Sequence, residues 1–315
     1  MSSENGTNSK LTWDRFWFSA GCVDQSARIR LLLCVTAATY FLGSFSDVNF
    51  WYHNGGPLGG DRVAVFLEVG SLEGAAKWIL SPLFLTNSLA VTYGYLVVGI
   101  GLAIFVGVGR SPRSEQPSRW SFGWAFAFWL VFVGWANRTM FVGGLAETLL
   151  SLALFASALS GLARPALLER RDPSESGLCQ RQHWTAGFSQ RLMAVQITIV
   201  GVATFVTMLA GRVWHNGIGA YALAAPAEDR TIDWTNTMLV NPLIHETLSH
   251  AILVAIPIGL VLAWKPSTNQ MGKCVLITWC IAIAVLGSHW LYAATFAIMV
   301  LAIFPTHPAK CDPVV

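Results

Sequence analysis

Residues Arg191 to Tyr221 read RLMAVQITIVGVATFVTMLAGRVWHNGIGAY, and this stretch decides the fold. Its first part, Leu192 to Leu209, has no acidic or basic residue and has the length of a helix that crosses a bilayer core of about 30 Å. Its second part is polar and aromatic, with Trp214, His215 and Asn216 followed by glycines. The stretch therefore predicts a membrane-crossing helix that ends in a cluster of hydrogen-bonding groups.

The composition of the whole chain favours a membrane protein over a soluble one. Of its 315 residues, 54% are hydrophobic and 12% are charged, and the mean hydropathy is +0.53. An average soluble domain carries roughly 25% charged residues, which it needs to cover its surface. The net charge of +3 gives no reason to expect a nucleic-acid partner.

Eight apolar segments of helical length follow one another along the chain. They are residues 29–45, 86–109, 120–135, 144–162, 192–209, 243–264, 271–287 and 290–304. Only Ser288 and His289 join the last two segments, so these are expected to form a hairpin of short helices. We therefore predict an all-α fold, a polytopic integral membrane protein with a bundle of about eight transmembrane helices.

The predicted membrane domain covers residues 29–306. A cytoplasmic N-terminal segment, 1–28, precedes it and a short cytoplasmic tail, 307–315, follows it. The polar N-terminus lacks the features of a cleavable signal peptide, so the first span is expected to remain as an anchor. Within the long connection 47–85, the stretch VAVFLEVGSLEGAAKWIL is interpreted as an interfacial helix, with a solvated loop as the alternative. Residues 164–190 are predicted to form a loop.

The basic residues predict the orientation. With the N-terminus inside, the inner segments hold 15 of the 20 Lys and Arg residues and the outer segments hold 5. Because inner loops of membrane proteins are enriched in Lys and Arg, both termini are expected in the cytoplasm.

The cysteines agree with this orientation, since none lies in a predicted outer loop where an oxidising compartment would form disulfides. We expect six free thiols with no zinc-binding spacing. They are Cys22, Cys34, Cys179, Cys274, Cys280 and Cys311.

Several short stretches occur in an order that resembles a known family. They are RIRLLLCVTAATYFL at 28–42, Y-x-x-G-G-P-L at 52–58, NRTMFVGG at 137–144, RLMAVQITIVGVATFVTMLAG at 191–211, W-x-x-G at 214–217 and LVAIP at 253–257. Through them the chain resembles the horizontally transferred transmembrane (HTTM) domain family, whose bacterial members share their membrane part with the vitamin K-dependent gamma-carboxylase. The resemblance covers nearly the whole chain and implies the membrane fold of that family and a place in a bacterial inner membrane.

The chain departs from the family at the positions that the resemblance makes reactive. In the carboxylase, a lysine between the Ala-Gly of the fifth span and the Trp of W-x-x-G is the base that starts the reaction. Here the sequence is AGRVW, and Arg212 stays protonated at neutral pH. Leu253 stands where an acidic residue is often found in the sixth span, and Thr278 where a histidine is common in the seventh. These departures argue against gamma-carboxylase activity.

Two similar polar clusters lie on the predicted outer side, WYHNGGPLGGDR at 51–62 and WHNGIGAY at 214–221. Their histidines, His53 and His215, could act as acid and base, because imidazole gains and loses a proton near neutral pH. They could also bind a metal with one of the aspartates Asp61, Asp229 or Asp233, although no spacing fixes a metal geometry. Alternatively, the clusters mark the aromatic belt at the membrane interface.

The start of the sixth span, NPLIHETLSHA, carries a third group of candidates. His245 and His250 lie about 140° apart around a helix, a poor arrangement for chelating a metal. Glu246 and His250 share a helix face and could form either a functional pair or a hydrated structural contact. We assign no metal-binding residue. The catalytic candidates are His53, His215, Glu246 and His250.

The ligand-binding candidates are polar and aromatic side chains near the outer ends of the spans: Arg138, Glu147, Arg212, Trp214, Asn216 and Tyr221. Glu147 is expected to need a partner such as Arg138 or an aqueous cavity.

Two function hypotheses follow. The first is a non-carboxylating membrane protein that holds a lipid, a quinone-like or other apolar molecule, or a partner protein in an outer-facing cavity. The alternative is a membrane-embedded enzyme, carboxylase-like or redox, that uses the outer histidines. A transporter is disfavoured because the spans lack deep charged residues and a clear internal repeat. Membrane lipids are expected partners, and the sequence identifies no cofactor and no protein partner.

Overall fold

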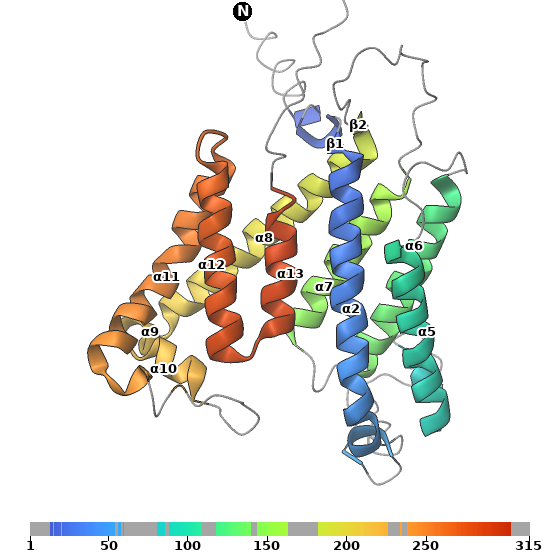
Figure 1. Cartoon of the computed structure of the whole chain (residues 1–315), viewed down its shortest axis with the longest axis horizontal. Coiled ribbons are helices and arrows are strands. Elements are labelled where there is room, and N and C mark those ends of the chain that lie inside the picture. Colours follow the sequence, from blue (N-terminus) through green and yellow to red (C-terminus); the bar gives the residue numbers. More distant parts are fainter. Residues whose placement is uncertain are drawn as a thin grey trace, which may run out of the picture. The chain divides into compact units, whose positions relative to one another are not determined.

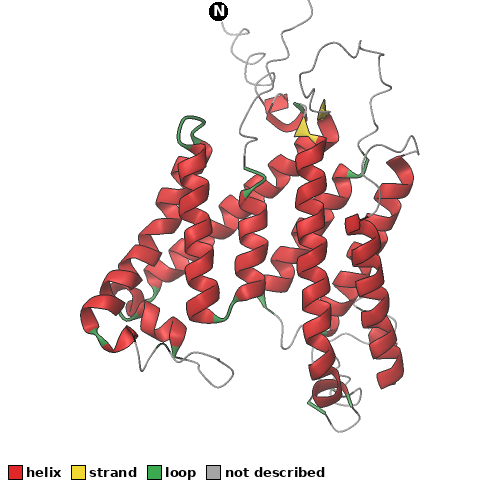
Figure 2. Cartoon of the chain, viewed as in Figure 1, coloured by secondary structure: helices red, strands yellow, loops and turns green. Residues whose placement is uncertain are grey.

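The computed structural model describes residues 13–14, 16–19, 21–53, 56–57, 59, 81–85, 88–108, 118–139, 144–162, 182–225, 234 and 238–303. Almost all of this part of the chain is helical (Figure 2). The exceptions with regular structure are two short antiparallel strands, β1 (Gly21–Cys22) and β2 (Gln182–His183). The predicted all-α class is confirmed.

Each of the eight apolar segments falls in a helix. These helices are α2 (Val23–Tyr52), α5 (Leu89–Val108), α6 (Ser118–Arg138), α7 (Leu145–Ser160), α8 (Trp184–Ala210), α11 (Pro242–Trp264), α12 (Asn269–Gly287) and α13 (Trp290–Val300). Within the described residues, five of them are long and apolar enough to cross a membrane: α2, α5, α8, α11 and α12. The helices α7 and α13 are apolar but shorter. This composition indicates a membrane-embedded protein.

Three predicted boundaries are wrong. Helix α2 begins at Val23, before the predicted start of the first span at Ile29. Helix α2 continues past Phe45 to Tyr52, although a connection was expected from Asp47. Helix α8 begins at Trp184 inside the predicted loop 164–190. Helix α8 begins early because polar side chains of its first turns are hydrogen-bonded inside the fold. Gln190 Nε2 donates to the carbonyl of Cys22 at 2.8 Å and to Ser26 Oγ at 3.0 Å. Polar residues that suggest a solvated loop are buried in the structure.

Other expectations lie outside the described residues. These are the interfacial helix within 63–80, the loop 163–181, the two terminal segments 1–12 and 304–315, and the residues Asp61, Asp229, Asp233, Cys179 and Cys311. The four described cysteines are free thiols, as predicted: Cys22, Cys34, Cys274 and Cys280.

The chain divides into two compact units, Ala27–Arg171 and Met1–Ser26 with Asp172–Val315. The first, which we call the α2–α7 unit, contains most of α2, the 3-10 helix η1 (Pro82–Leu85), α5, α6 and α7. The second, the α8–α13 unit, contains both strands, α8, α9 (Arg212–His215), α10 (Gly219–Ala224), η2 (Met238–Val240), α11, α12 and α13.

In the α8–α13 unit, α11, α12 and α13 follow one another as neighbouring antiparallel helices (Figure 1). Glycines allow α11 and α12 to approach closely. A Cβ atom on Gly259 would lie 2.7 Å from Leu276 Cγ, and one on Gly272 would collide with the backbone of Ala263. Small residues at helix contacts are typical of membrane bundles.

In the α2–α7 unit, Phe41 of α2 forms the centre of an aromatic core. Its ring lies 6.5 Å from that of Phe128 and 5.8 Å from that of Phe132, both on α6. On α5, a Cβ atom at Gly99 would lie 2.9 Å from Phe41 Cε2, so glycine makes room for the ring. Three helices therefore meet on one buried phenylalanine.

Candidate functional site

The turn after α8 is built on a glycine with a left-handed backbone. Gly217 has φ +72°, and it follows the short helix α9 as the first residue beyond its cap. Its N–H donates to the carbonyl of Trp214 at 3.2 Å, and the N–H of Ile218 donates to the carbonyl of Val213 at 2.9 Å. These two bonds form a Schellman motif, which ends helices at glycine. The W-x-x-G sequence thus encodes the end of α9 and the direction of the chain after it.

The carbonyl of Gly217 connects this turn to α11. It accepts hydrogen bonds from His245 Nδ1 at 3.0 Å and from Ser249 Oγ at 2.8 Å. Ser249 is fully buried, lies 2.6 Å from the carbonyl of His245, and accepts from the backbone N–H of Ala220 at 2.8 Å. One hydroxyl therefore joins the turn, α10 and α11.

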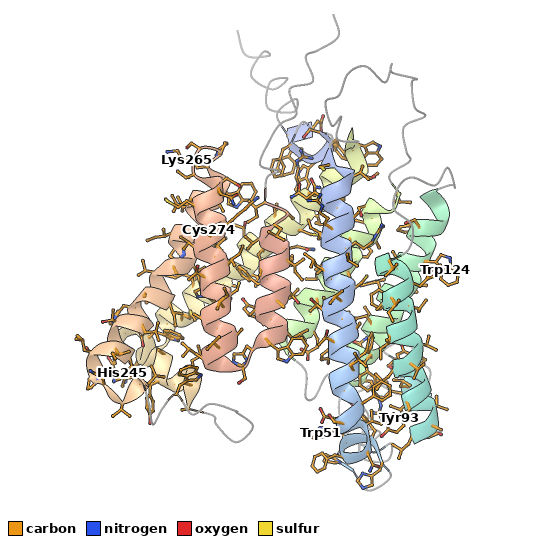
Figure 3. All side chains as sticks on the ribbon, viewed as in Figure 1. Trp51, Tyr93, Trp124, His245, Lys265 and Cys274 are labelled. Carbon is orange, nitrogen blue, oxygen red and sulfur yellow. The ribbon has the colours of Figure 1, made fainter. Side chains whose placement is uncertain are left out.

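His245 is the most strongly positioned histidine of this region. A carbonyl oxygen can only accept, so His245 Nδ1 carries the hydrogen and Nε2 of the neutral ring is an acceptor. The ring is half-buried and edge-on to Tyr221, with centroids 6.2 Å apart. Figure 3 labels it at the end of α11 opposite Lys265. Sequence spacing alone suggests His245 only as a metal ligand. The signal that would have identified its role is Ser249, one helical turn later, which also bonds to Gly217.

Two of the neighbouring catalytic candidates, His250 and His215, bond to backbone carbonyls. His250 Nδ1 donates to the backbone carbonyl of Glu246 at 2.8 Å, so the bond between these residues is not the carboxylate–imidazole pair considered from the sequence. Glu246 is exposed and its side chain lies against Gly217, where a Cβ atom would be 2.6 Å from Glu246 Cγ. His215 is exposed and its Nε2 donates to the carbonyl of Leu209.

The ligand-binding candidates of this unit lie around the same turn. Trp214 is half-buried and its ring covers Gly219, where any Cβ atom would collide with it. Tyr221 packs on His245, as described above. Arg212 and Asn216 are exposed. We call Trp214, Gly217, Tyr221, His245 and Ser249 the turn site.

Glu147 and Arg138 belong to the α2–α7 unit and have other partners than expected. Glu147 Oε2 accepts from the backbone N–H of Gly144 at 2.7 Å, which caps α7, and Oε1 accepts from Tyr40 at 3.2 Å. The Arg138 guanidinium lies 5.0 Å from the Tyr52 ring centroid and 5.1 Å from that of Phe84, at cation–π distance. The described contacts of Glu147 are thus a phenol and a helix end, not Arg138.

His53 also lies in the α2–α7 unit, just after α2. It is exposed, and its Nδ1 donates to the carbonyl of Phe50 at 3.2 Å. His53 is therefore in a different unit from His215, Glu246 and His250. Among the described residues, no group of three His, Cys, Asp or Glu side chains is placed to hold a metal ion.

Comparison with known proteins adds no relative: no family model, no curated protein and no solved structure matches the chain.

Proposed function

We propose that this chain is a multi-pass protein of a bacterial inner membrane, related to the HTTM family, that binds a lipid-soluble molecule with a hydroxyl group at the turn site. In this proposal α2, α5, α6, α7, α8, α11, α12 and α13 all cross the membrane and both termini are cytoplasmic, so the turn site lies at the outer surface. The distribution of Lys and Arg supports this orientation. A quinol, or a lipid with a hydroxylated headgroup, has the required chemistry.

The observation that carries the proposal is the hydrogen bond from His245 Nδ1 to the Gly217 carbonyl. It leaves Nε2 as a hydrogen-bond acceptor on a ring that Tyr221 packs against. Ser249 positions the same carbonyl from inside the fold, so the imidazole does not need to reorganise when a ligand donates to it. Such a fixed acceptor at the end of a membrane helix suits a molecule that is apolar except for a hydroxyl group.

The departures from the carboxylase support binding over carboxylation. Arg212, in the gap where the resemblance puts the base, is exposed on α9. Leu253 is buried in α11 and Thr278 is exposed on α12, and neither can take up a proton near neutral pH.

The test uses the purified full-length protein and a pair of ligands. We expect a short-chain ubiquinol to quench tryptophan fluorescence saturably, because Trp214 borders the turn site. Its dimethyl ether, in which a methyl group replaces each hydroxyl hydrogen, should bind about two- to twelvefold more weakly, since one hydrogen bond to a neutral acceptor contributes about 0.5–1.5 kcal/mol.

A matched variant separates binding from folding. In His245→Asn the amide N–H can still donate to the Gly217 carbonyl, but the acceptor at the Nε2 position is gone. The variant should keep its thermal stability and lose the preference for the quinol. Equal binding of quinol and ether by the natural protein, or an unchanged preference in His245→Asn, refutes the proposal. Turnover of the bound quinol would move the assignment to an enzyme.

A further inference from the structure

Residues 13–14 and 16–19 bring a group of aromatic side chains to one end of the α8–α13 unit. The ring centroid of Trp17 lies 5.7 Å from that of Phe188 on α8, and Phe18 stacks on the same Phe188 ring with centroids 6.1 Å apart. Phe16 stacks on Trp264, the last residue of α11, at 6.3 Å. Two more rings join this group: the Trp13 centroid lies 5.7 Å from that of Trp17, and the Trp184 centroid lies 6.1 Å from that of Phe18. We call these residues the N-terminal aromatic cluster: Trp13, Phe16, Trp17, Phe18, Trp184, Phe188 and Trp264.

Specific polar contacts hold this segment on α8. Arg191 donates to the carbonyl of Ser19 at 2.7 Å and to that of Trp17 at 3.4 Å, it also bonds Ser19 Oγ, and its guanidinium lies 5.9 Å from the Phe16 ring. Gly21 and Gly187 touch backbone to backbone, because a Cβ atom on either would collide with the other segment. The strand β1 then pairs with β2 directly before α8. The segment is thus a fixed part of this unit.

Its outer aromatic side chains are exposed although its inner ones are packed. Trp13 is 63% exposed, Phe18 52% and Trp184 51%. Large apolar rings gathered at this exposure mark a surface that contacts something other than water.

The place of the cluster in the fold identifies what it contacts. Trp184 is the first residue of α8 and Trp264 the last of α11, and both helices have the length and composition of membrane spans. The ends of such spans lie at the surface of the bilayer, where tryptophan is the preferred residue. Beside Trp264, the exposed Lys265 adds a positive charge that anionic headgroups attract.

We propose that the N-terminal aromatic cluster lies in the headgroup layer of the membrane leaflet at which α8 begins, with Trp13, Phe18 and Trp184 inserted among the lipids. The residues 13–14 and 16–19 then form an interfacial anchor that Arg191 holds on α8. It sets the depth of α8 in the bilayer and so belongs to the membrane domain, not to the preceding cytoplasmic segment. This inference is independent of any ligand at the turn site.

Spin labels test the depth of the cluster in vesicles that contain anionic lipid. In a cysteine-free background, Phe18→Cys carries one label, and two control sites of the same unit carry the others. Val261→Cys, 71% exposed on α11, reports the acyl region, and Ser267→Cys, exposed in the α11–α12 hairpin, reports water. The measured quantity is the ratio of the label's collision rate with oxygen to its collision rate with a water-soluble nickel chelate. This ratio at position 18 should lie between the values at the two control sites. Trp184→Cys, a second site on the cluster, should give the same depth.

Each other outcome overturns the proposal. A label at position 18 that meets the nickel chelate as often as position 267 lies in water. A label shielded from both oxygen and nickel is covered by protein instead of lipid. If position 261 also reports water, the α8–α13 unit is not inserted at all. A further variant, Arg191→Gln, should raise the mobility of the label at position 18 and leave that at Trp184→Cys unchanged, whereas equal mobility at position 18 would show that Arg191 is no clamp.

Discussion

The replacement Gly217→Ala should destabilise the protein through two separate costs. Gly217 has φ +72°, a conformation that costs an alanine about 1–2 kcal/mol. The new Cβ atom would also lie 2.6 Å from Glu246 Cγ and 3.1 Å from Glu246 Cα, and overpacking of this kind costs about 1–3 kcal/mol. We therefore expect a loss of about 2–5 kcal/mol in the free energy of unfolding, from the sum of these two contributions.

The native cysteines provide the assay. Cys22, Cys34 and Cys280 are 5%, 2% and 2% exposed, so a thiol-reactive fluorogenic dye will detect unfolding as these thiols become accessible. The exposed Cys274 is first replaced by serine to lower the background. At a fixed heating rate, the apparent Tm of Gly217→Ala should fall by a few °C, since 1 kcal/mol corresponds to about 2–4 °C for about 150–250 residues and to less in a longer chain such as this one.

Two further variants separate the two costs. Gly101→Ala is the matched control, because nothing lies within 4 Å of its new Cβ atom and, among the described glycines, only Gly217 has a positive φ. Its Tm should be unchanged or slightly higher, as alanine favours helix. Adding Glu246→Ala to Gly217→Ala removes the Cγ contact and should restore part of the loss. A Gly217→Ala protein as stable as the natural one, or a Gly101→Ala protein equally destabilised, would refute the reasoning.

The remaining predictions concern the other contacts and the orientation. Ser249→Ala should lower stability by about 1–3 kcal/mol in the same thermal assay, because a buried backbone N–H loses its acceptor; no change would mean that the hydroxyl is not the joint between turn and helix. Tyr40→Phe should cost about 1–2 kcal/mol by removing the hydrogen bond to Glu147 Oε1, and it should cost clearly less in a Glu147→Ala background, where the 3.5 Å contact of the hydroxyl with Thr139 Oγ1 is still lost. For the orientation, an impermeant maleimide applied to intact spheroplasts should label Asn216→Cys and not Ser267→Cys, and the opposite result would invert the proposed topology.

Hydropathy predicts this fold well because membrane helices satisfy their own backbone groups. An apolar run such as Leu192–Leu209 has no other regular structure in a bilayer, so its helix follows from composition alone. The ends of the same helices depend on tertiary partners. Gln190 looks like a loop residue until Cys22 and Ser26, far away in sequence, accept its hydrogen bonds. The local sequence around Gln190 does not predict these distant partners, and for this reason α8 begins earlier than predicted.

The turn site shows the same division between local and distant information. W-x-x-G, followed by a polar region, predicts a turn, and the turn is there as a Schellman motif. The residues that give it chemical meaning come from α11, where His245 and Ser249 bond to Gly217 across 28 and 32 positions of sequence. Helical spacing within α11 drew attention to Glu246 and His250, whose partners are a glycine and a backbone carbonyl. His245 is identified by its contact with Gly217 in a distant segment, and not by the spacing of residues within α11.

The geometry also accounts for the W-x-x-G motif without reference to any catalytic activity. Trp214 covers Gly219, and Gly217 adopts the left-handed conformation that ends α9, so both motif residues are required by the turn itself. The gap residues Arg212 and Val213 are exposed, and the side chain of neither takes part in the bonds of the turn. Folding therefore constrains the motif and leaves the gap free to change. A resemblance based on W-x-x-G supports a shared turn, and activity has to be argued from the residues in the gap.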